Sequence, residues 1–261
     1  MRTNQFPKTQ IIDLTLKGHA EDYKVNISLS HSDFLEEYLN IVKLLHPQEL
    51  NYFCQLSFEE RIKSYLAGRY TAKKAILASL NKENLEMNEI SVNSGVFNQP
   101  VVLQPTSSNI QVTITHCENI GAAIAFPESI IMGIDIEKIS DGRIAVMESI
   151  ITPQEKNLMN DLTYSKEIVL TLFWTIKEAL SKTLKTGLTL PFYMYEIREV
   201  RTIGNAIFTS FENFHQYQTV SFTFDTYICS IAYPKSVSIN INDVKNLILQ
   251  VQNLKKIKQV T

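Results

Sequence analysis

The sequence predicts an α+β protein of two similar lobes related by a pseudo-two-fold axis, each an antiparallel-rich sheet packed against a long helix. Strand-like and helix-like segments come twice along the 261 residues, in similar order. A short motif near residue 47 recurs near residue 153. The content of 44% hydrophobic and 20% charged residues is ordinary for a globular protein of this length with a substantial core.

The individual elements follow from the spacing of apolar residues. Alternation predicts strands at 11–16, 23–30, 109–117, 121–126, 130–138, 194–200, 219–224 and 227–233. Helical spacing predicts helices near 31–45, 57–80, 142–150, 153–160, 164–186 and 242–257. A long helix therefore falls in the middle of each half of the chain.

The repeat aligns without gaps at an offset of 106 residues. "PQE" occurs at 47–49 and at 153–155, and in each copy the proline opens a short helix that precedes the long one. We therefore expect an N-terminal lobe at 1–127 and a C-terminal lobe at 128–261 that carries the metal site and a C-terminal helix. A ligand cleft between the lobes is a common arrangement.

The two copies differ in chemistry. At this offset Trp174 faces Gly68, and Glu178 faces Ala72. Only the second long helix carries a carboxylate at that position. One composite site is therefore expected rather than two identical sites.

Composition argues against several classes of protein. The formal net charge of −2 gives no global attraction to nucleic acid or to an anionic membrane. Cys54, Cys117 and Cys229 form no C-x-x-C pair, which argues against a disulfide framework and a thiolate zinc site. Neither a signal peptide nor an apolar run long enough to span a bilayer is evident. We expect a cytoplasmic protein that binds neither nucleic acid nor membrane.

The segment "GIDIEK" at 133–138 predicts a pair of carboxylates on one face of a strand. Side chains alternate along a strand, so Asp135 and Glu137 share a face while Ile134 and Ile136 point into the core. Two neighbouring carboxylates repel, and a hard cation such as Mg²⁺ relieves the repulsion. A solvated acidic strand end is the alternative interpretation.

The segment "FWTIKEALSK" at 173–182 predicts a helix with chemistry on one face. Trp174, Glu178 and Lys182 are spaced i, i+4, i+8 and lie above one another. Glu178 could supply a third metal ligand, and Lys182 could reach a phosphate oxygen. Lys177 is expected to hold Glu178 in place. An ordinary surface ion pair remains the alternative.

Two further segments could bind phosphate. Thr115 and His116 end a strand, and a hydroxyl and an imidazole there can both donate to a phosphate, although a single His is more often structural. One predicted helix, at 57–80, carries a cluster of basic residues: Arg61, Lys63, Arg69, Lys73 and Lys74. They could grip the phosphates of a nucleotide, or form a solvated helix face.

Together, "GIDIEK" and "FWTIKEALSK" resemble the G-x-D-x-E and W-x-x-K-E-x-x-x-K signatures of the 4′-phosphopantetheinyl transferases, of the monomeric, two-lobed surfactin-synthetase-activating type. The resemblance implies transfer of the 4′-phosphopantetheine arm of coenzyme A to a serine of an apo acyl or peptidyl carrier protein. It also implies Mg²⁺ dependence and release of adenosine 3′,5′-bisphosphate. Such proteins serve fatty acid, polyketide or nonribosomal peptide biosynthesis.

The resemblance assigns roles to residues that match the motifs. Asp135, Glu137 and Glu178 match the metal-binding carboxylates. Lys182 matches a lysine that contacts the pyrophosphate of coenzyme A, and Thr115-His116 stands where the family usually has Ser-His. For the other cofactor contacts, Lys63 lies near the residue that binds the 3′-phosphate, and Arg69 belongs to the same basic helix. The implied catalytic residues are Glu178, Lys182 and His116.

Two departures from the family pattern leave alternatives open. Gln99 stands where relatives usually have a lysine, in "FNQP" at 97–100, and Cys117 follows the His where a Ser is common. A catalytically weak relative that binds coenzyme A or a carrier protein is one alternative, and a metal-dependent phosphodiesterase is another. By the same resemblance, segment 139–151 is expected to dock the carrier protein.

Overall fold

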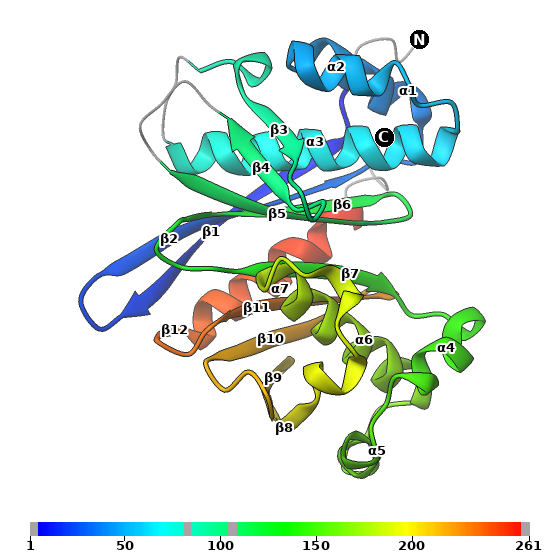
Figure 1. Ribbon diagram of the computed structural model, residues 1–261, viewed down its shortest axis with the longest axis vertical. Coiled ribbons are helices and arrows are strands. Elements are labelled where there is room, and N and C mark those ends of the chain that lie inside the picture. Colours follow the sequence, from blue (N-terminus) through cyan, green and yellow to red (C-terminus); the bar gives the residue numbers. More distant parts are fainter. Residues whose placement is uncertain (1–4, 81–84, 104–108, 257–261) are drawn as a thin grey trace.

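The protein is built around two antiparallel sheets, seen here in a computed structural model that describes residues 5–80, 85–103 and 109–256 (Figure 1). The first sheet has the strand order β12-β1-β2-β6-β5, and the second β7-β11-β10-β9-β8. The first contains β1 (Lys8–Gly18), β2 (Asp22–His31), β5 (Ile110–Cys117), β6 (Ile120–Pro127) and β12 (Val237–Ile239). The second contains β7 (Gly133–Lys138), β8 (Ile197–Ile203), β9 (Ala206–Phe211), β10 (Tyr217–Phe224) and β11 (Tyr227–Pro234). A separate two-stranded ribbon consists of β3 (Ser91–Ser94) and β4 (Pro100–Leu103).

Helices cover the outer face of each sheet. Helix α3 packs on β2, β5 and β6, while α6 packs on β7 and β11 (Figure 1). The α-helices are α1 (Leu35–Leu39), α2 (Pro47–Phe53), α3 (Glu59–Leu80), α4 (Ile144–Ser149), α5 (Pro153–Asn160), α6 (Lys166–Thr183) and α7 (Ile241–Lys256). The last residue of the helix predicted at 242–257 lies outside the described ranges. No helix among the described residues is long and apolar enough to span a membrane.

The order of elements is the same in both lobes. The series β2, α2, α3, β3, β4, β5, β6 corresponds to β7, α5, α6, β8, β9, β10, β11. Strands β2, β6 and β5 are neighbours in that order, as are β7, β11 and β10. The predicted α+β class, with two similar lobes that each pack an antiparallel sheet on a long helix, is therefore confirmed.

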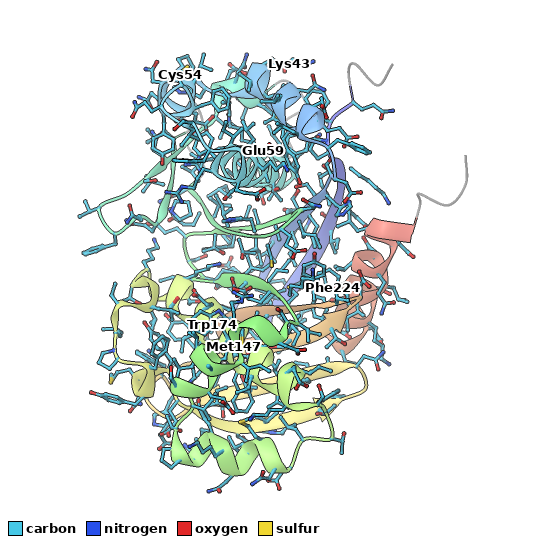
Figure 2. The ribbon with its side chains drawn as sticks, turned by 90° about the vertical axis from the view of Figure 1, so that its right-hand side faces the viewer. Lys43, Cys54, Glu59, Met147, Trp174 and Phe224 are labelled. Atoms are coloured by element: carbon cyan, nitrogen blue, oxygen red, sulfur yellow. The ribbon has the colours of Figure 1, made fainter. Side chains whose placement is uncertain are left out.

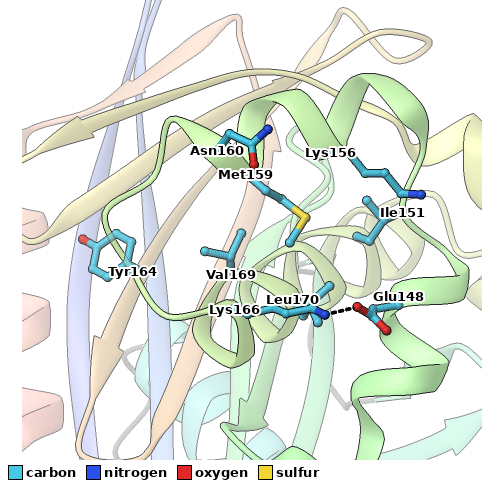
Figure 3. Close-up of a pocket in the computed structure, with 9 residues that line it drawn as sticks. All are labelled: Glu148, Ile151, Lys156, Met159, Asn160, Tyr164, Lys166, Val169 and Leu170. Atoms are coloured by element: carbon cyan, nitrogen blue, oxygen red, sulfur yellow. Dashed lines mark ion pairs between the residues drawn. The ribbon is translucent and has the colours of Figure 1, made fainter.

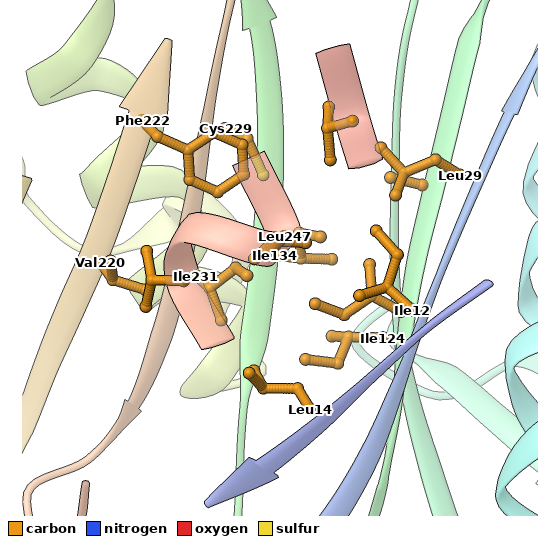
Figure 4. Packing of buried hydrophobic residues seen from close by; sticks show 14 of the residues in the cluster. Ile12, Leu14, Leu29, Ile124, Ile134, Val220, Phe222, Cys229, Ile231 and Leu247 are labelled. Atoms are coloured by element: carbon orange, nitrogen blue, oxygen red, sulfur yellow. The ribbon is translucent and has the colours of Figure 1, made fainter. Parts of the chain in front are cut away.

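The inner faces of the two sheets share one hydrophobic core. Ile12, Leu14, Leu29 and Ile124 from the first sheet face Ile134, Val220, Phe222, Cys229 and Ile231 from the second, and α7 adds Leu247 (Figure 4). Apolar burial of this extent is the main stabilising term for the fold. Because the core joins β1, β2 and β6 to β7, β10 and β11, it holds the lobes together beside the site.

The C-terminal segment returns to the first lobe. Strand β12 pairs with the end of β1, where Leu16 lies opposite Ile239. Helix α7 packs on β1 and β2. The division of the chain at 127/128 stays a prediction, and this segment contributes to both sides of the shared core.

In each lobe, a buried ion pair joins the short helix to the long helix that follows it. In the first lobe, Glu49 of α2 pairs with Lys73 of α3 at 2.5 Å and accepts the Val92 N–H at 2.9 Å. In the second, Glu155 of α5 pairs with Lys177 of α6 at 2.8 Å and accepts the Ile197 N–H at 2.9 Å. Both carboxylates also complete a capping box at the start of their helix.

These ion pairs correct the alignment of the repeat. Lys73 and Lys177 make the same contacts but are 104 residues apart, so the long helices are two residues out of step with the gapless offset. Glu178 therefore lies opposite Lys74, not Ala72. The expectation of one composite site is unaffected, because the first long helix still has no carboxylate at this position.

Candidate functional site

The site begins with strand β7, whose two faces have different roles. Ile134 and Ile136 are buried in the shared core. Asp135 and Glu137 point to the opposite face, where both accept hydrogen bonds from α6. The alternation predicted from the sequence is therefore confirmed for this strand.

Glycine at the start of β7 lets α6 approach closely. A Cβ placed on Gly133 would lie 2.1 Å from the Ala179 carbonyl oxygen and 2.5 Å from Thr183 Oγ1. Only glycine tolerates this contact with helix backbone. The close approach brings the last turns of α6 directly over the Asp135 carboxylate.

Helix α6 places three polar groups on the face that meets β7. Trp174 lies in the second lobe (Figure 2), and its Nε1–H donates to Glu137 Oε1 at 3.3 Å. Lys182 Nζ, two turns later, donates to Asp135 Oδ1 at 2.7 Å. Glu178 lies between them on the same face. Thus the predicted i, i+4, i+8 face does meet the carboxylate strand.

The first lobe reaches the same carboxylate through β5. Thr115 Oγ1 donates to Asp135 Oδ1 at 2.9 Å and accepts the Ile136 N–H at 3.3 Å. Thr115 is only 4% exposed. Its hydroxyl therefore ties β5 to β7 across the boundary between the lobes and orients Asp135, while its proposed contact with a cofactor stays a prediction.

Glu178 has a carboxyl group that resists ionisation. Burial and the nearby charges of Asp135 and Glu137 together raise its pKa to about 7, against the opposing effect of Lys182. A carboxyl with this pKa exchanges its proton near neutral pH. Such values are typical of acid–base groups and of metal ligands that lack their cation.

The donor set fits a hard divalent cation. Asp135 Oδ2 is buried without a hydrogen-bond partner, and a buried unpaired carboxylate oxygen is costly. Oxygen ligands from Asp and Glu are those that Mg²⁺ prefers. Within the described ranges, however, no three Asp, Glu, His or Cys side chains are already gathered closely enough to hold an ion. Asp135, Glu137 and Glu178 therefore stay a predicted metal set, one that would have to draw together around the ion.

A cavity of about 590 Å³ opens beside this cluster, between α3 and β5. Its lining comprises Tyr52, Arg61, Ser64, Tyr65, Gly68, Arg69, Asn93, Ser94, Asn98, Pro100, Ile114 and His116. The two arginines give it a positive charge, and the tyrosines and Ile114 give it flat apolar walls. This combination suits a nucleotide with phosphate groups.

His116 connects the cavity to the carboxylate cluster. Its Nε2 lies 2.6 Å from Ser64 Oγ. Loss of hydration among the surrounding side chains lowers the pKa of His116, and Lys182 lowers it further. The imidazole is therefore neutral at physiological pH, so one ring nitrogen donates a hydrogen bond and the other accepts one.

Of the two residues expected to bind the cofactor from the basic helix, Arg69 lines the cavity and Lys63 does not. Arg69 lines the cavity, where its guanidinium lies 4.6 Å from the Tyr65 ring centroid and its Nε lies 3.8 Å from buried Glu49. Lys63 forms ion pairs with Glu59 and Glu60 and is not part of this lining. The role predicted for Lys63 stays a prediction.

Arg61 belongs to the basic cluster but received no role from the resemblance. Arg61, Ser64, Tyr65 and Gly68 all line the cavity. They are spaced i, i+3, i+4 and i+7, which is one face of a helix. Applying this spacing to the basic cluster would have selected Arg61 over Lys63.

The expectation that Lys177 holds Glu178 is wrong. Lys177 is fully buried, and its Nζ donates to the Ile150 carbonyl at 2.9 Å and to Glu155 at 2.8 Å. Burial lowers the pKa of Lys177, and Glu155 opposes that change. Its neighbour in sequence, Glu178, points to the site because adjacent residues on a helix lie about 100° apart.

The segment expected to dock a carrier protein starts beside the cluster. Arg143 Nη2 donates to Glu137 Oε2 at 2.6 Å. Val146, further along in α4, is 57% exposed. This surface offers Arg143, which is paired with Glu137, and an exposed apolar side chain in α4.

A separate cavity of about 670 Å³ lies between α4, α5 and the start of α6 (Figure 3). Val169, Leu170 and Met159 line it together with the Lys166–Glu148 ion pair. It contains none of the residues predicted to bind metal or cofactor, although Glu148 and Ile151 belong to the predicted docking segment 139–151. We assign no chemistry to it.

Comparisons with known proteins locate a family match in the second lobe. The model of the 4′-phosphopantetheinyl transferase superfamily matches residues 131–232. This segment contains Asp135, Glu137, Glu178 and Lys182. No curated protein matches the chain.

Two solved structures resemble part of the chain. A holo-(acyl-carrier-protein) synthase from Bacillus anthracis str. Ames, in complex with CoA (3′,5′-ADP), is 17% identical with a TM-score of 0.35, covering 43% of this chain and 96% of that one. A holo-ACP-synthase from Plasmodium yoelii is 22% identical with a TM-score of 0.34, covering 46% of this chain and 95% of that one.

Proposed function

We propose that this protein transfers the 4′-phosphopantetheine arm of coenzyme A to a serine of an apo acyl or peptidyl carrier protein. The observation that carries the proposal is the meeting of Asp135, Glu137, Glu178 and Lys182 beside a positively charged cavity. The family match over residues 131–232 supports it, since it covers these four residues. The products are the loaded carrier protein and adenosine 3′,5′-bisphosphate.

The cavity between α3 and β5 would hold the nucleotide part of coenzyme A. Arg61 and Arg69 line it and provide cations for the phosphate groups, which guanidinium groups bind through paired N–H donors. Tyr65 offers an aromatic wall. The diphosphate would then extend towards His116 and Lys182, next to Asp135.

Asp135, Glu137 and Glu178 would hold Mg²⁺, which supplies charge neutralisation and polarisation at the diphosphate when bound. The orphaned Asp135 Oδ2 is the atom that most needs this partner. Thr115 keeps the other oxygen of Asp135 in place. Hydrogen bonds thus hold Asp135 in place, and Glu178 would move towards the ion on binding.

Glu178 is the group we assign to the proton of the attacking serine. The serine oxygen bonds to the phosphorus that carries the pantetheine arm, and the bond from that phosphorus to the bridging oxygen breaks. The proton passes to the carboxylate of Glu178, directly or through a water molecule. Lys182 and the imidazole of His116 would stabilise the charge that collects on the departing phosphate.

We also propose that the protein acts as a monomer of the two-lobed surfactin-synthetase-activating type. The first lobe supplies Thr115, His116 and the cavity, and the second supplies the carboxylates and Lys182. One chain therefore provides both sides of the site. The carrier protein would dock on 139–151, where Arg143 could exchange its bond to Glu137 for a contact with an acidic partner.

A mass assay with coenzyme A, Mg²⁺ and an apo carrier protein tests the proposal. We expect the wild type to add one phosphopantetheine to the carrier. Asp135→Ala and Glu178→Ala should lower the rate at least a hundredfold while melting as folded proteins, because each removes a ligand from the reacting centre. Glu199→Ala, on β8 at an exposed position, is the matched control and should load normally.

Other outcomes would favour the alternatives. Coenzyme A binding without any loading by the wild type would favour a relative that only binds, a possibility supported by the neutral Gln99. Hydrolysis of a phosphodiester without a carrier would favour a phosphodiesterase. Undiminished loading by Asp135→Ala would contradict the roles assigned to the carboxylates.

A further inference from the structure

Helix α6 ends at a residue in an uncommon backbone conformation. Lys185 has φ of 56°, its N–H donates to the Lys182 carbonyl, and the Thr186 N–H donates to the Ser181 carbonyl at 3.1 Å. This is the pattern of a helix closed by a left-handed residue, a position that glycine usually occupies. A side chain at positive φ is destabilising. Residues held in a strained backbone conformation cluster at functional sites.

The side chain of Lys185 crosses the boundary between the lobes. Its Nζ donates to Gln111 Oε1 on β5 at 3.3 Å. The amide is uncharged, so the bond leaves the ammonium charge unneutralised. Lys185 thereby presents a cation to the first lobe from the end of α6, three residues beyond Lys182.

A cavity of about 210 Å³ lies at this point. Lys182 and Lys185 line it from the second lobe, with Gln99, Pro100, Thr113 and Ile114 among those from the first. It shares Asn98, Pro100 and Ile114 with the larger cavity that contains Arg61 and Arg69. The two cavities are therefore adjacent along β4 and β5.

The combined lining of these two cavities is strongly biased in charge. It contains Arg61, Arg69, Lys182 and Lys185, but neither Asp nor Glu among its described residues; Lys182 is paired with Asp135 and Arg69 lies near Glu49, both outside the lining. A chain with a net charge of −2 has thus gathered four cations along one groove. Such a groove suits an anion with several phosphate groups.

Gln99 occupies the opposite wall without contributing charge. Its Oε1 accepts the Phe97 N–H at 2.9 Å, which folds the side chain back on its own turn. We propose that Lys185 supplies the cation missing at Gln99 and binds the diphosphate of coenzyme A on the side of the pantetheine arm. This inference rests on the proposed function. A role in binding explains why a lysine occupies this position at the end of α6, where glycine would be less strained.

Three substitutions at Lys185 separate binding from stability. Lys185→Asn removes the charge and keeps a residue that tolerates positive φ, whereas Lys185→Gly removes both charge and strain. By calorimetric titration with Mg²⁺ present, we expect both to weaken coenzyme A binding about tenfold, the loss expected for one hydrogen bond to a charged group. Lys185→Gly should nevertheless melt at a higher temperature than the wild type. Lys185→Arg should bind within about threefold of the wild type.

Two controls distinguish the charge from the contact with Gln111. Gln111→Ala removes the contact and keeps the ammonium group, and its affinity should match that of the wild type. Adding Gln99→Lys to Lys185→Gly returns a cation from the other wall and should recover most of the lost affinity. Binding of adenosine 3′,5′-bisphosphate, which lacks the phosphate on the pantetheine side, should change by less than twofold in every Lys185 variant.

The inference and the proposed function fail in different ways. Unchanged coenzyme A affinity in Lys185→Gly and Lys185→Asn, beside a wild type that binds and loads a carrier, would overturn the inference alone. An equal loss in Gln111→Ala would also overturn it, because Lys185 would then act through its contact with Gln111 and not through its charge. A wild type that does not bind coenzyme A would overturn both.

Discussion

The two carboxylate oxygens of Asp135 differ in their hydrogen bonds. Its Oδ1 receives Thr115 from the first lobe and Lys182 from α6, while its Oδ2 is buried and receives nothing. An unsatisfied buried oxygen costs about 1–3 kcal/mol. This carboxylate is therefore held by one oxygen while the other stays free of hydrogen bonds, as the proposed metal ligand requires.

Glu178 makes the stability of the metal-free protein depend on pH. Its pKa is about 7 in the folded state, against 4.5 for the ordinary group. Between these values the folded state binds more protons than the unfolded state, so the free energy of unfolding falls as pH rises. We expect a decrease of about 1–3 kcal/mol from pH 4.5 to pH 8 that is attributable to this residue.

Urea unfolding in the presence of a chelator measures this contribution. Glu178→Gln keeps the size of the side chain and cannot ionise, so its stability should vary less over the same pH range. Glu199→Gln serves as an exposed control and should follow the wild type. An equally steep decrease in Glu178→Gln would mean that another group carries the effect.

At the scale of elements, the buried pairs Glu49–Lys73 and Glu155–Lys177 fix each long helix to the short helix before it. Each carboxylate also reaches the next strand, through Val92 or Ile197. The second pair belongs to α6, the helix that also carries Glu178 and Lys182.

Removing one partner of a buried pair should destabilise the protein strongly. We expect Lys177→Met to lower the free energy of unfolding by about 3–5 kcal/mol, because Glu155 is left buried without its cation. Lys73→Met should cost a similar amount in the first lobe. Chemical unfolding of both variants measures the loss.

The same variant distinguishes structure from catalysis at Lys177. A structural role predicts that the folded fraction of Lys177→Met still loads carrier at a rate near that of the wild type. Full stability combined with lost activity would instead place Lys177 in the reaction.

At the scale of the whole molecule, local patterns predicted much of the architecture. Alternation identified β7 and its two faces, and helical spacing identified α6 and the face that meets β7. The repeat indicated two similar lobes. These features depend on neighbours in sequence, where periodicity is informative.

Contacts between distant segments could not be predicted from local sequence patterns. Strand β12 has three residues and gains its structure by pairing with β1 at the other end of the chain. Thr115 meets Asp135 only because the sheets bring β5 beside β7. The partner of Lys177 was also hidden, since Glu155 lies on another helix.

The central claim is that Asp135, Glu137 and Glu178 gather around one divalent ion between the lobes. A crystal grown with coenzyme A and Mn²⁺, which gives an anomalous signal that Mg²⁺ lacks, tests this most directly. The account predicts a single strong anomalous peak bonded to all three carboxylates, with Lys182 close to the diphosphate. Bound coenzyme A with a peak elsewhere, or with Glu178 turned away from the ion, would contradict it.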